Sequence, residues 1–379
     1  MQQIRVLQAL RGIAACAVVY GHAYSRALIA WPDVARRAYV FHFRDLMFVG
    51  AAGVDLFFVL SGFLMVYLHR DQFGQGMSWA FFKRRLARIV PLYWSLSIVG
   101  IILLYVAPRL FTHHTSREWP WIAGSFLFVP WPASTGFKEP IIGAGWTLDY
   151  EMYFYVLFAA AMLLRRGLTL LFGVMITSVV LGWLLRPGHP WAALVTNVLL
   201  LEFLMGAGVA VLVSRLQVSR AMSWLFVAVA VTWLGATILH SPGEFRVLGW
   251  GLPCALLVAG TVWMNGTLDH RVGRFTVMLG DASYSIYLFQ VFALPCFAFV
   301  FTALHLVSRL PIDLIVFVVA AGSCAAGVLV SRFLERPMTD LARRYVRGKS
   351  SMPPPRSPDH SGDIGHIAGD ALAAGEAGR

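Results

Sequence analysis

The chain has 379 residues, of which 58% are hydrophobic and only 13% are charged, and it carries a formal net charge of +12. Because soluble domains average about 25% charged residues, this composition excludes an ordinary soluble protein. Apolar runs of about 20 residues, each long enough to cross a bilayer as a helix, fill most of the sequence. The basic residues lie mainly in short loops between these runs, so membrane topology explains the charge better than nucleic-acid binding does.

The apolar runs predict an all-α bundle of about ten transmembrane helices. Their expected limits are 7–28, 48–69, 89–109, 146–164, 168–186, 193–214, 221–239, 246–264, 283–305 and 311–333. The apolar stretch 121–130 is too short to cross a membrane and predicts a re-entrant or interfacial element. We expect residues 1–347 to form the membrane domain. Residues 348–379 are rich in proline, serine, alanine and glycine, which predicts a disordered cytoplasmic tail.

Lysine and arginine are more frequent in one set of alternate loops than in the other. Since these residues mark the cytoplasmic side, their distribution predicts that both termini are cytoplasmic. The cysteines are Cys16, Cys254, Cys296 and Cys324, and all lie in apolar stretches without CxxC spacing. This pattern favours buried small side chains, and we expect neither a disulfide framework nor a metal site.

The first predicted span contains two ionisable residues, Arg11 and His22. They are eleven residues apart, which is close to three helical turns, so both project from nearly the same face about 16 Å apart. Ionisable groups inside a membrane span are costly and are therefore functional candidates. We expect the two residues to act at different depths of one path.

Two further predicted spans carry carboxylates, Asp55 and Glu151. Counting residues from the outer ends of these spans places both carboxylates at a depth similar to that of His22. A histidine can take a proton from a hydroxyl, and a carboxylate can orient that histidine, so the cluster suits acid–base chemistry. The alternative is structural: Asp55 could pair with an arginine elsewhere and hold helices together. Ser61 is deeper and approaches the level of Arg11.

A basic cluster follows the second span, and it consists of Lys83, Arg84, Arg85 and Arg88. It precedes an expected helix with Pro91 near its start and is close to Tyr93 and Trp94. Arginines beside a helix start suit phosphate groups, which indicates a phosphate-rich ligand such as a coenzyme. Topology and anionic lipid head groups are the alternative explanations.

Six segments together resemble the acyltransferase-3 family of membrane O-acyltransferases. They are VLQALRGIAACAVVYGHA, GVDLFFVLSGFLM, FFKRRLARIVPLYW, WTLDYEMYFYVLF, GDASYSIYLFQV and FLERPM. They occur in the order typical of the family and cover nearly the whole chain except the tail. The chain is similar to the stand-alone members, which lack an additional soluble hydrolase-like domain.

The resemblance implies a multi-pass enzyme of the bacterial inner membrane with no permanently bound cofactor. It implies an acyl-CoA donor, usually acetyl-CoA, and an acceptor hydroxyl on an exopolysaccharide, O-antigen or lipo-oligosaccharide. Arg11 and His22 match the essential pair of the family, and Glu151 matches its acidic residue. Arg84, Arg85 and Arg88 match its basic motif. Gln290 stands where the family often has histidine, so we assign it no acid–base role.

The resulting hypothesis gives each candidate a role. The coenzyme phosphates would bind the basic cluster and Tyr93, with Arg11 further along the same path, near the pantetheine or the thioester. His22 would be the general base, oriented by Asp55 or Glu151. Ser61 and Tyr155 are candidate acyl carriers, and Trp146 is a candidate substrate contact; direct transfer and an acyl-enzyme both fit. The rival interpretations are a transporter or flippase of lipid-linked glycans, which intramembrane charges would also suit, and an acyl-CoA sensor without turnover.

Overall fold

The computed structural model describes residues 5–32, 48–107, 117–132, 137–238, 242–264 and 272–348. Its α-helices are α1 (Arg5–Ala30), α3 (Val49–His69), α4 (Ser78–Val106), α5 (Trp119–Leu127), α6 (Trp146–Ala161), α7 (Gly167–Leu185), α8 (Pro190–Val195), α9 (Leu200–Arg215), α10 (Arg220–Thr237), α11 (Leu252–Trp263), α12 (Arg274–Asp281), α13 (Ser283–Ala303), α14 (Ile312–Val330) and α15 (Arg336–Gly348). Two π-helical turns, η6 (Val247–Gly251) and η8 (Ser331–Glu335), run into α11 and α15. The predicted tail lies almost wholly outside the described residues.

The helical, multi-pass membrane architecture is confirmed. Among the described residues, eight helices are long and apolar enough to cross a membrane. The predicted spans 146–164 and 246–264 fall on two shorter helical segments, α6 with 16 residues and the stretch Val247–Trp263. The number of crossings and the cytoplasmic position of the termini stay predictions. Stretch 121–130 overlaps α5, which is followed by a two-stranded antiparallel pair, β1 (Trp131–Pro132) and β2 (Phe137–Lys138).

The third helix begins earlier than predicted. We expected it to start at residue 89, after the basic cluster, but α4 runs without interruption from Ser78 to Val106 and includes Pro91 in its interior. Proline removes one backbone hydrogen bond, yet α4 packs against α6 and α15, so tertiary contacts outweigh that loss. The basic cluster therefore lies along a helix and not at its N-terminus, and the helix-dipole argument for phosphate binding was wrong.

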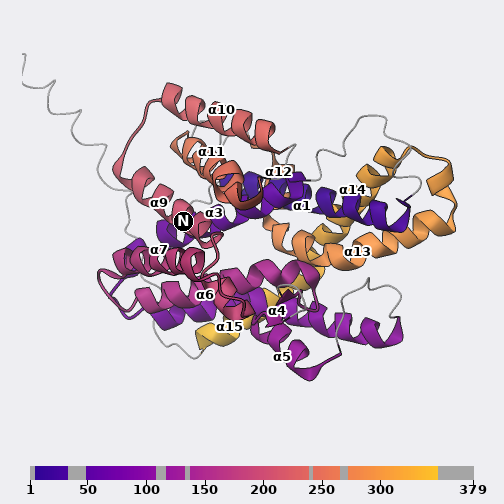
Figure 1. The fold of residues 1–379 in the computed structure, drawn as a ribbon, viewed down its shortest axis with the longest axis horizontal. Helices are drawn as coiled ribbons and strands as arrows, with labels where there is room; N and C mark the ends of the chain where they lie inside the picture. Colours follow the sequence, from indigo (N-terminus) through magenta and orange to yellow (C-terminus); the bar gives the residue numbers. More distant parts are fainter. Residues whose placement is uncertain are drawn as a thin grey trace, which may run out of the picture.

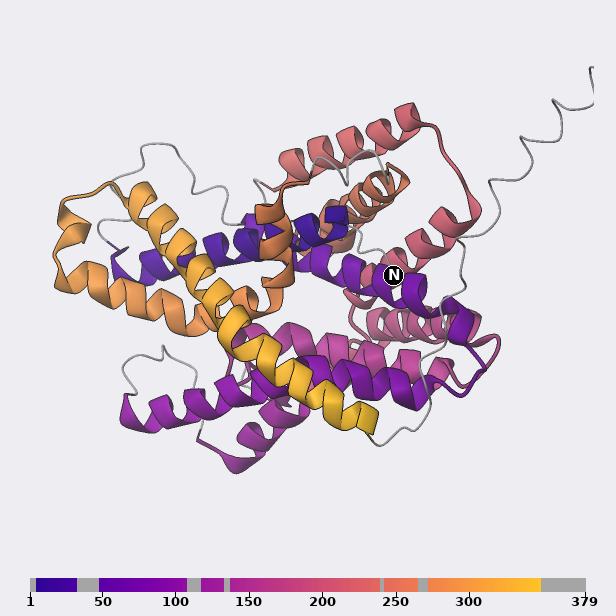
Figure 2. The same cartoon turned by 180° about the vertical axis from the view of Figure 1, so that it is seen from behind.

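The bundle is arranged around α1 and α3, which lie between α10 and α11 on one side and α4, α5 and α6 on the other (Figure 1). From behind, α14 and α15 follow one long diagonal from α13 to α4 (Figure 2). This diagonal connects the part of the bundle that contains α1 with the part that contains α4. It positions the last described segment of the chain against the basic helix.

Small residues let the central helices approach closely, as is common in membrane bundles. A Cβ atom at Gly53 of α3 would lie 2.8 Å from the carbonyl oxygen of Ala14 in α1. One at Gly62 of α3 would lie 1.9 Å from the carbonyl oxygen of Phe203 in α9. Glycine is therefore required at both positions, and these contacts fix how α3 sits between its two neighbours.

Candidate functional site

An internal cavity of about 120 Å³ lies where five helices, α1, α3, α4, α6 and α13, converge. Its lining includes six residues that the sequence singled out: Arg11, Ser61, Arg85, Arg88, Glu151 and Tyr155. A water molecule needs roughly 10–15 Å³ of such space, so the cavity can hold several waters or a slim ligand group. The described cavity therefore unites six predicted residues that are up to 144 positions apart in the chain (11 to 155).

Glu151 is the centre of a hydrogen-bond network in this cavity. The Ser61 hydroxyl donates to Glu151 Oε1 at 3.2 Å, and the Tyr155 hydroxyl donates to the same oxygen. The charge of Glu151 also acts on the guanidinium groups of Arg11 and Arg85. Ser61 and Tyr155, the two candidate acyl carriers, thus share one oxygen of Glu151. The two arginines named above balance the negative charge of that carboxylate.

The α4 end of the cavity is strongly basic. The Arg85 guanidinium lies over the rings of Phe81 and Tyr155, at 5.4 Å and 5.8 Å from their centroids, and its buried Nε has no hydrogen-bond partner among the residues that the structure describes. Arg88 forms an ion pair with Glu335, with 3.6 Å between Nη2 and Oε1. Three arginines (11, 85 and 88) meet two carboxylates (151 and 335), which leaves one surplus positive charge. This end therefore favours an anionic group.

Glu335 is a site residue that our reading of the sequence missed. It is buried at the end of η8, and its Oε2 accepts hydrogen bonds from Ser285 at 2.6 Å and Ser331 at 2.9 Å. Its other oxygen, Oε1, is the one that meets Arg88. The signal was available in the FLERPM segment, but we had placed Glu335 just outside the last span and gave it no role.

His22 lies apart from the cavity, at the other end of α1. It is three turns, or about 16 Å, from Arg11 along the helix, as the spacing predicted. Its recorded polar neighbour is Gln290 of α13, whose amide nitrogen donates to the carbonyl of Tyr287. The His22 side chain is exposed in the described bundle, so it is accessible from the protein surface.

The predicted common depth of His22 and Glu151 was wrong. Close contacts of Gly50 with Gly21 and of Gly53 with Ala14 set α1 and α3 side by side in opposite directions, so Ser61 lies beyond Arg11 on the side away from His22. Glu151 binds Ser61 and therefore shares that level. The prediction counted residues from the start of a full-length span, but α6 has 16 residues and starts deeper in the bundle.

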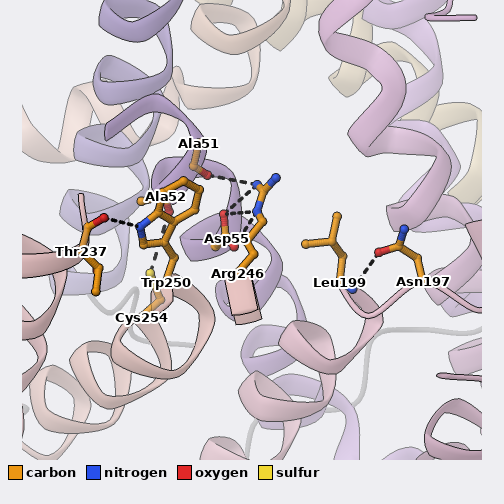
Figure 3. A network of polar contacts seen from close by, with 9 residues as sticks. All are labelled: Ala51, Ala52, Asp55, Asn197, Leu199, Thr237, Arg246, Trp250 and Cys254. Atoms are coloured by element: carbon orange, nitrogen blue, oxygen red, sulfur yellow. Dashed lines mark hydrogen bonds and ion pairs between the residues drawn. The ribbon is translucent and has the colours of Figure 1, made fainter. Parts of the chain in front are cut away.

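Asp55 has a partner of its own, as Figure 3 shows. Its fully buried carboxylate accepts from Arg246 Nη2 at 2.8 Å and from Nε at 3.1 Å and 3.2 Å. The same guanidinium lies 5.5 Å from the ring centroid of Trp250. Asp55 therefore has the structural role given above as the alternative. Its ion pair with Arg246 holds the start of η6 against α3, so the carboxylate is not available to orient His22.

Four other candidates do not line the described cavity: Lys83, Arg84, Tyr93 and Trp146. Tyr93 is fully buried, donates to the carbonyl of Ser125 at 3.0 Å and stacks on Phe128, so it joins α4 to α5. Its expected contact with a coenzyme is therefore replaced by a packing role. Lys83 lies 5.8 Å from the ring centroid of Trp79, Arg84 is exposed, and Trp146 contacts Tyr150 edge-on.

A polytopic helical membrane protein with a charged internal cavity is the class that this fold and site define. The acyltransferase-3 family, described as an acyltransferase domain, matches residues 4–332. This match covers most of the chain, so the protein belongs to that family and is a membrane acyltransferase.

Three curated proteins show the similarity in more detail. Exopolysaccharide production protein ExoZ of Rhizobium meliloti (strain 1021) is 30% identical over 316 residues, which cover 79% of this chain and 93% of that protein. Nodulation protein 10 of Rhizobium leguminosarum bv. viciae is 26% identical over 74% of this chain and 80% of its own length. Acyltransferase MdmB of Streptomyces mycarofaciens is 30% identical over 40% of this chain and 37% of its own length. No solved structure matches.

Proposed function

We propose that the protein transfers an acyl group, in the first instance acetyl, from acyl-CoA to a hydroxyl of a bacterial surface or secreted polysaccharide. The observation that carries this proposal is the cavity that brings Arg11, Arg85 and Arg88 together with Ser61 and Glu151. The name of the relative ExoZ, an exopolysaccharide production protein, supports an exopolysaccharide as the acceptor. The enzyme would act in the bacterial inner membrane.

The basic end of the cavity is the proposed donor end. Coenzyme A is an anion with several phosphate groups, and arginines bind phosphate by paired charge-assisted hydrogen bonds. The surplus positive charge around Arg11, Arg85 and Arg88 suits such a group, and the unpartnered Nε of Arg85 is a donor ready for it. Arg84 and Lys83, earlier on the same helix, extend the basic surface along which the donor would approach.

The His22 end is the proposed acceptor end. His22 would take the proton of the acceptor hydroxyl while the oxygen attacks the thioester carbonyl. The carbon–sulfur bond then breaks, and the proton passes to the departing thiolate, so acyl-CoA and a hydroxyl become an ester and free coenzyme A. Because Arg11 and His22 are about 16 Å apart along α1, the thioester must extend beyond Glu151 toward His22.

Ser61 offers a second chemical route through the same site. Its hydroxyl already donates to Glu151, the arrangement that activates a nucleophile. In that route the Ser61 oxygen would attack the thioester carbonyl, the carbon–sulfur bond would break, and the serine proton would pass by way of Glu151 to the departing thiolate, which leaves as free coenzyme A. The glycan hydroxyl would then attack the Ser61 ester and return the proton to Ser61. Mass spectrometry of protein quenched after mixing with acetyl-CoA alone separates the routes, because only the second adds an acetyl group to the peptide that contains Ser61.

The central test uses the full chain in nanodiscs, radiolabelled acetyl-CoA, and alkali-deacylated exopolysaccharide from the strain that carries the gene. We expect label in the polysaccharide with the unmodified protein and none with His22→Ala or Glu151→Gln. His189→Ala, at an exposed position before α8, is the matched control and should retain activity. Transbilayer movement of unmodified lipid-linked glycan without label transfer would contradict the proposal.

A further inference from the structure

The last described helices form one continuous helical segment that is longer than a membrane is thick. α14, η8 and α15 follow one another without a break from Ile312 to Val346, a length of 35 residues, and they make the long diagonal of Figure 2. At 1.5 Å per residue the segment measures about 52 Å, whereas the hydrocarbon core of a bilayer is about 30 Å thick. About 20 residues cross that core, so a span that starts at Ile312 leaves it near Ser331. α15 therefore lies at the level of the lipid head groups.

α15 and the turn before it carry a row of exposed apolar side chains. Leu334, Leu341 and Tyr345 are seven and four residues apart, so they lie along one side of the helix, and their surfaces are 41%, 70% and 69% exposed. A different side, with Glu335 and Thr339, is buried against the bundle. Because exposed apolar side chains are unfavourable in water, the row is typical of a helix that lies in the membrane interface with this side toward the acyl chains.

Exposed arginines flank the apolar row. The segment 332–346 has four of them, and they are Arg332, Arg336, Arg343 and Arg344. Of its two carboxylates, Glu335 is buried and Asp340 is exposed, 4.0 Å from Arg343. Arg336 meets Asp281 of α12 at 3.8 Å. Four positive charges against the two carboxylates of Asp340 and Asp281 leave two in surplus, so this surface complements the anionic head groups that attract basic residues to a membrane.

We infer that α15 binds anionic phospholipids, with Leu341 and Tyr345 against the acyl chains and Arg343 and Arg344 on the head-group phosphates. Basic residues and an apolar row on one helix are the two features that interfacial binding to such lipids requires. Coenzyme A also carries phosphates, so the experiment has to distinguish these two sources of the same anionic group.

Lipid binding at α15 also supports the donor end of the cavity. Glu335 is the last residue of η8 and Arg336 is the first of α15, so the position of α15 determines where the carboxylate that pairs with Arg88 lies. π-helical turns such as η8 are rare and often occur at functional sites. A phospholipid that holds α15 in the interface therefore holds Glu335 against Arg88. This connection rests on the proposed acyl-CoA donor, whereas lipid binding does not.

The test maps lipid contacts on the full chain in nanodiscs of phosphatidylcholine with an equal amount of phosphatidylglycerol. A trace of either lipid carries a photoactivatable diazirine near its head group, and mass spectrometry identifies the cross-linked peptides. We expect the phosphatidylglycerol probe to label α15 more than the phosphatidylcholine probe does, and excess unlabelled phosphatidylglycerol to compete. Free coenzyme A should leave the label unchanged. Displacement of the label by coenzyme A would assign the arginines to the donor and overturn the lipid site.

Two double variants separate α15 from general surface charge. Arg343→Gln with Arg344→Gln should reduce the preference for phosphatidylglycerol at α15 about tenfold or more, because each cation near an anionic surface adds to the attraction. Arg165→Gln with Arg166→Gln removes the same charge from exposed positions between α6 and α7, and it should leave the label at α15 unchanged. Label on the exposed helix α10 should be the same in both variants. An equal loss at α15 in both double variants would contradict a specific site.

Binding of radiolabelled acetyl-CoA tests the connection to the donor end. In nanodiscs with phosphatidylglycerol, Arg343→Gln with Arg344→Gln should bind acetyl-CoA up to about tenfold less tightly than the unmodified protein, the loss expected when Arg88 is no longer held by Glu335. In phosphatidylcholine alone the two proteins should bind equally. Equal affinity in both lipids would overturn the connection. Lipid label at α15 without acetyl-CoA binding in any nanodisc would contradict the proposed donor and support the lipid site.

Discussion

Arg88 and Glu335 form an ion pair that joins α4 to the π-helical turn η8, with 3.6 Å between Nη2 and Oε1. The two residues are far apart in the chain and belong to two different motifs of the sequence. Ser285 and Ser331 fix the carboxylate from its other side. Glu335 is therefore a positioning residue: it holds Arg88 at the donor end of the cavity and does not line the cavity itself.

Glu335→Gln should weaken donor binding more than it slows turnover. The amide keeps the shape and hydrogen-bonding capacity at Ser285 and Ser331 but loses the charge that holds Arg88. Hydrogen bonds to charged groups contribute about 1.5–3 kcal/mol, so we expect the KM for acetyl-CoA to rise about tenfold or more with a smaller change in kcat. Steady-state kinetics at saturating polysaccharide measure both constants.

The control for this variant is Asp281→Asn. Asp281 pairs with Arg336 at 3.8 Å, close to η8 but at a partly exposed position. Exposed ion pairs contribute little, so both constants should stay near those of the unmodified enzyme. A Glu335→Gln enzyme that loses kcat and stability together, with the KM for the donor unchanged, would show that Glu335 is purely structural.

Asp55→Asn should destabilise the fold, in contrast to the catalytic role that the sequence suggested. The change leaves the Arg246 guanidinium without its anionic partner in a buried setting. Breaking a buried ion pair on one side typically costs about 3–5 kcal/mol. Thermal unfolding in detergent measures the loss, and Asp55→Leu combined with Arg246→Met should recover part of it because both partners of this ion pair are then removed.

An Asp55→Asn protein that is as stable as the unmodified one, but inactive with acetyl-CoA bound, would restore the orienting role. The neighbouring Glu202 gives a further comparison, because its charge also acts on Arg246 from α9. Glu202→Gln leaves the direct contacts between Asp55 and Arg246 in place. It should therefore reduce the unfolding temperature less than Asp55→Asn does.

The sequence predicted where most of the helices lie and six of the residues that line the cavity, because both depend on local signals. Apolar runs mark spans, and charges inside or beside spans mark functional positions, which is how Arg11, Arg85 and Glu151 were found. Depth could not be predicted in the same way. It depends on where each helix starts in the bundle and on close contacts such as Gly53 with Ala14, which no single segment records.

Interaction partners that are far apart in the chain could not be predicted from the sequence either. Asp55 and Arg246 are 191 residues apart, and nothing in either segment identifies the other. Tyr93 next to the arginines looked like a ligand contact, but its partner is the backbone of Ser125 in α5. In both examples the residue type showed that burying the polar side chain in a membrane would be unfavourable. Only the fold showed which partner binds that side chain.

Tyr93→Phe should leave donor binding unchanged. The variant loses one hydrogen bond, to the carbonyl of Ser125, and keeps the stacked contact with Phe128. The expected loss of stability is about 1 kcal/mol, which thermal unfolding in nanodiscs detects. A rise in the KM for acetyl-CoA comparable to that of Arg85→Ala would mean that the Tyr93 hydroxyl reaches the donor after all.

Cys16 and Cys324 should form an oxidative cross-link between α1 and α14. Their sulfur atoms lie 3.8 Å apart, and both residues are only partly buried. A disulfide needs the sulfurs about 2.05 Å apart, an approach that side-chain rotation can supply when the helices already pack together. Cys16 is on the central stretch of α1, between Arg11 and His22, so the cross-link also reports whether that stretch moves against α14 during turnover.

The experiment uses copper phenanthroline on membranes, followed by proteolysis and mass spectrometry of the linked peptides. We expect the 16–324 pair as the main product, and loss of this product in Cys16→Ser. If the reaction needs α1 and α14 to separate, the cross-linked protein loses acyl transfer and regains it with a reductant, because the two helices are then released. Full activity of the cross-linked form would mean that donor and acceptor meet without relative motion of these helices. A dominant link between Cys254 and Cys296 would contradict the packing of the bundle itself.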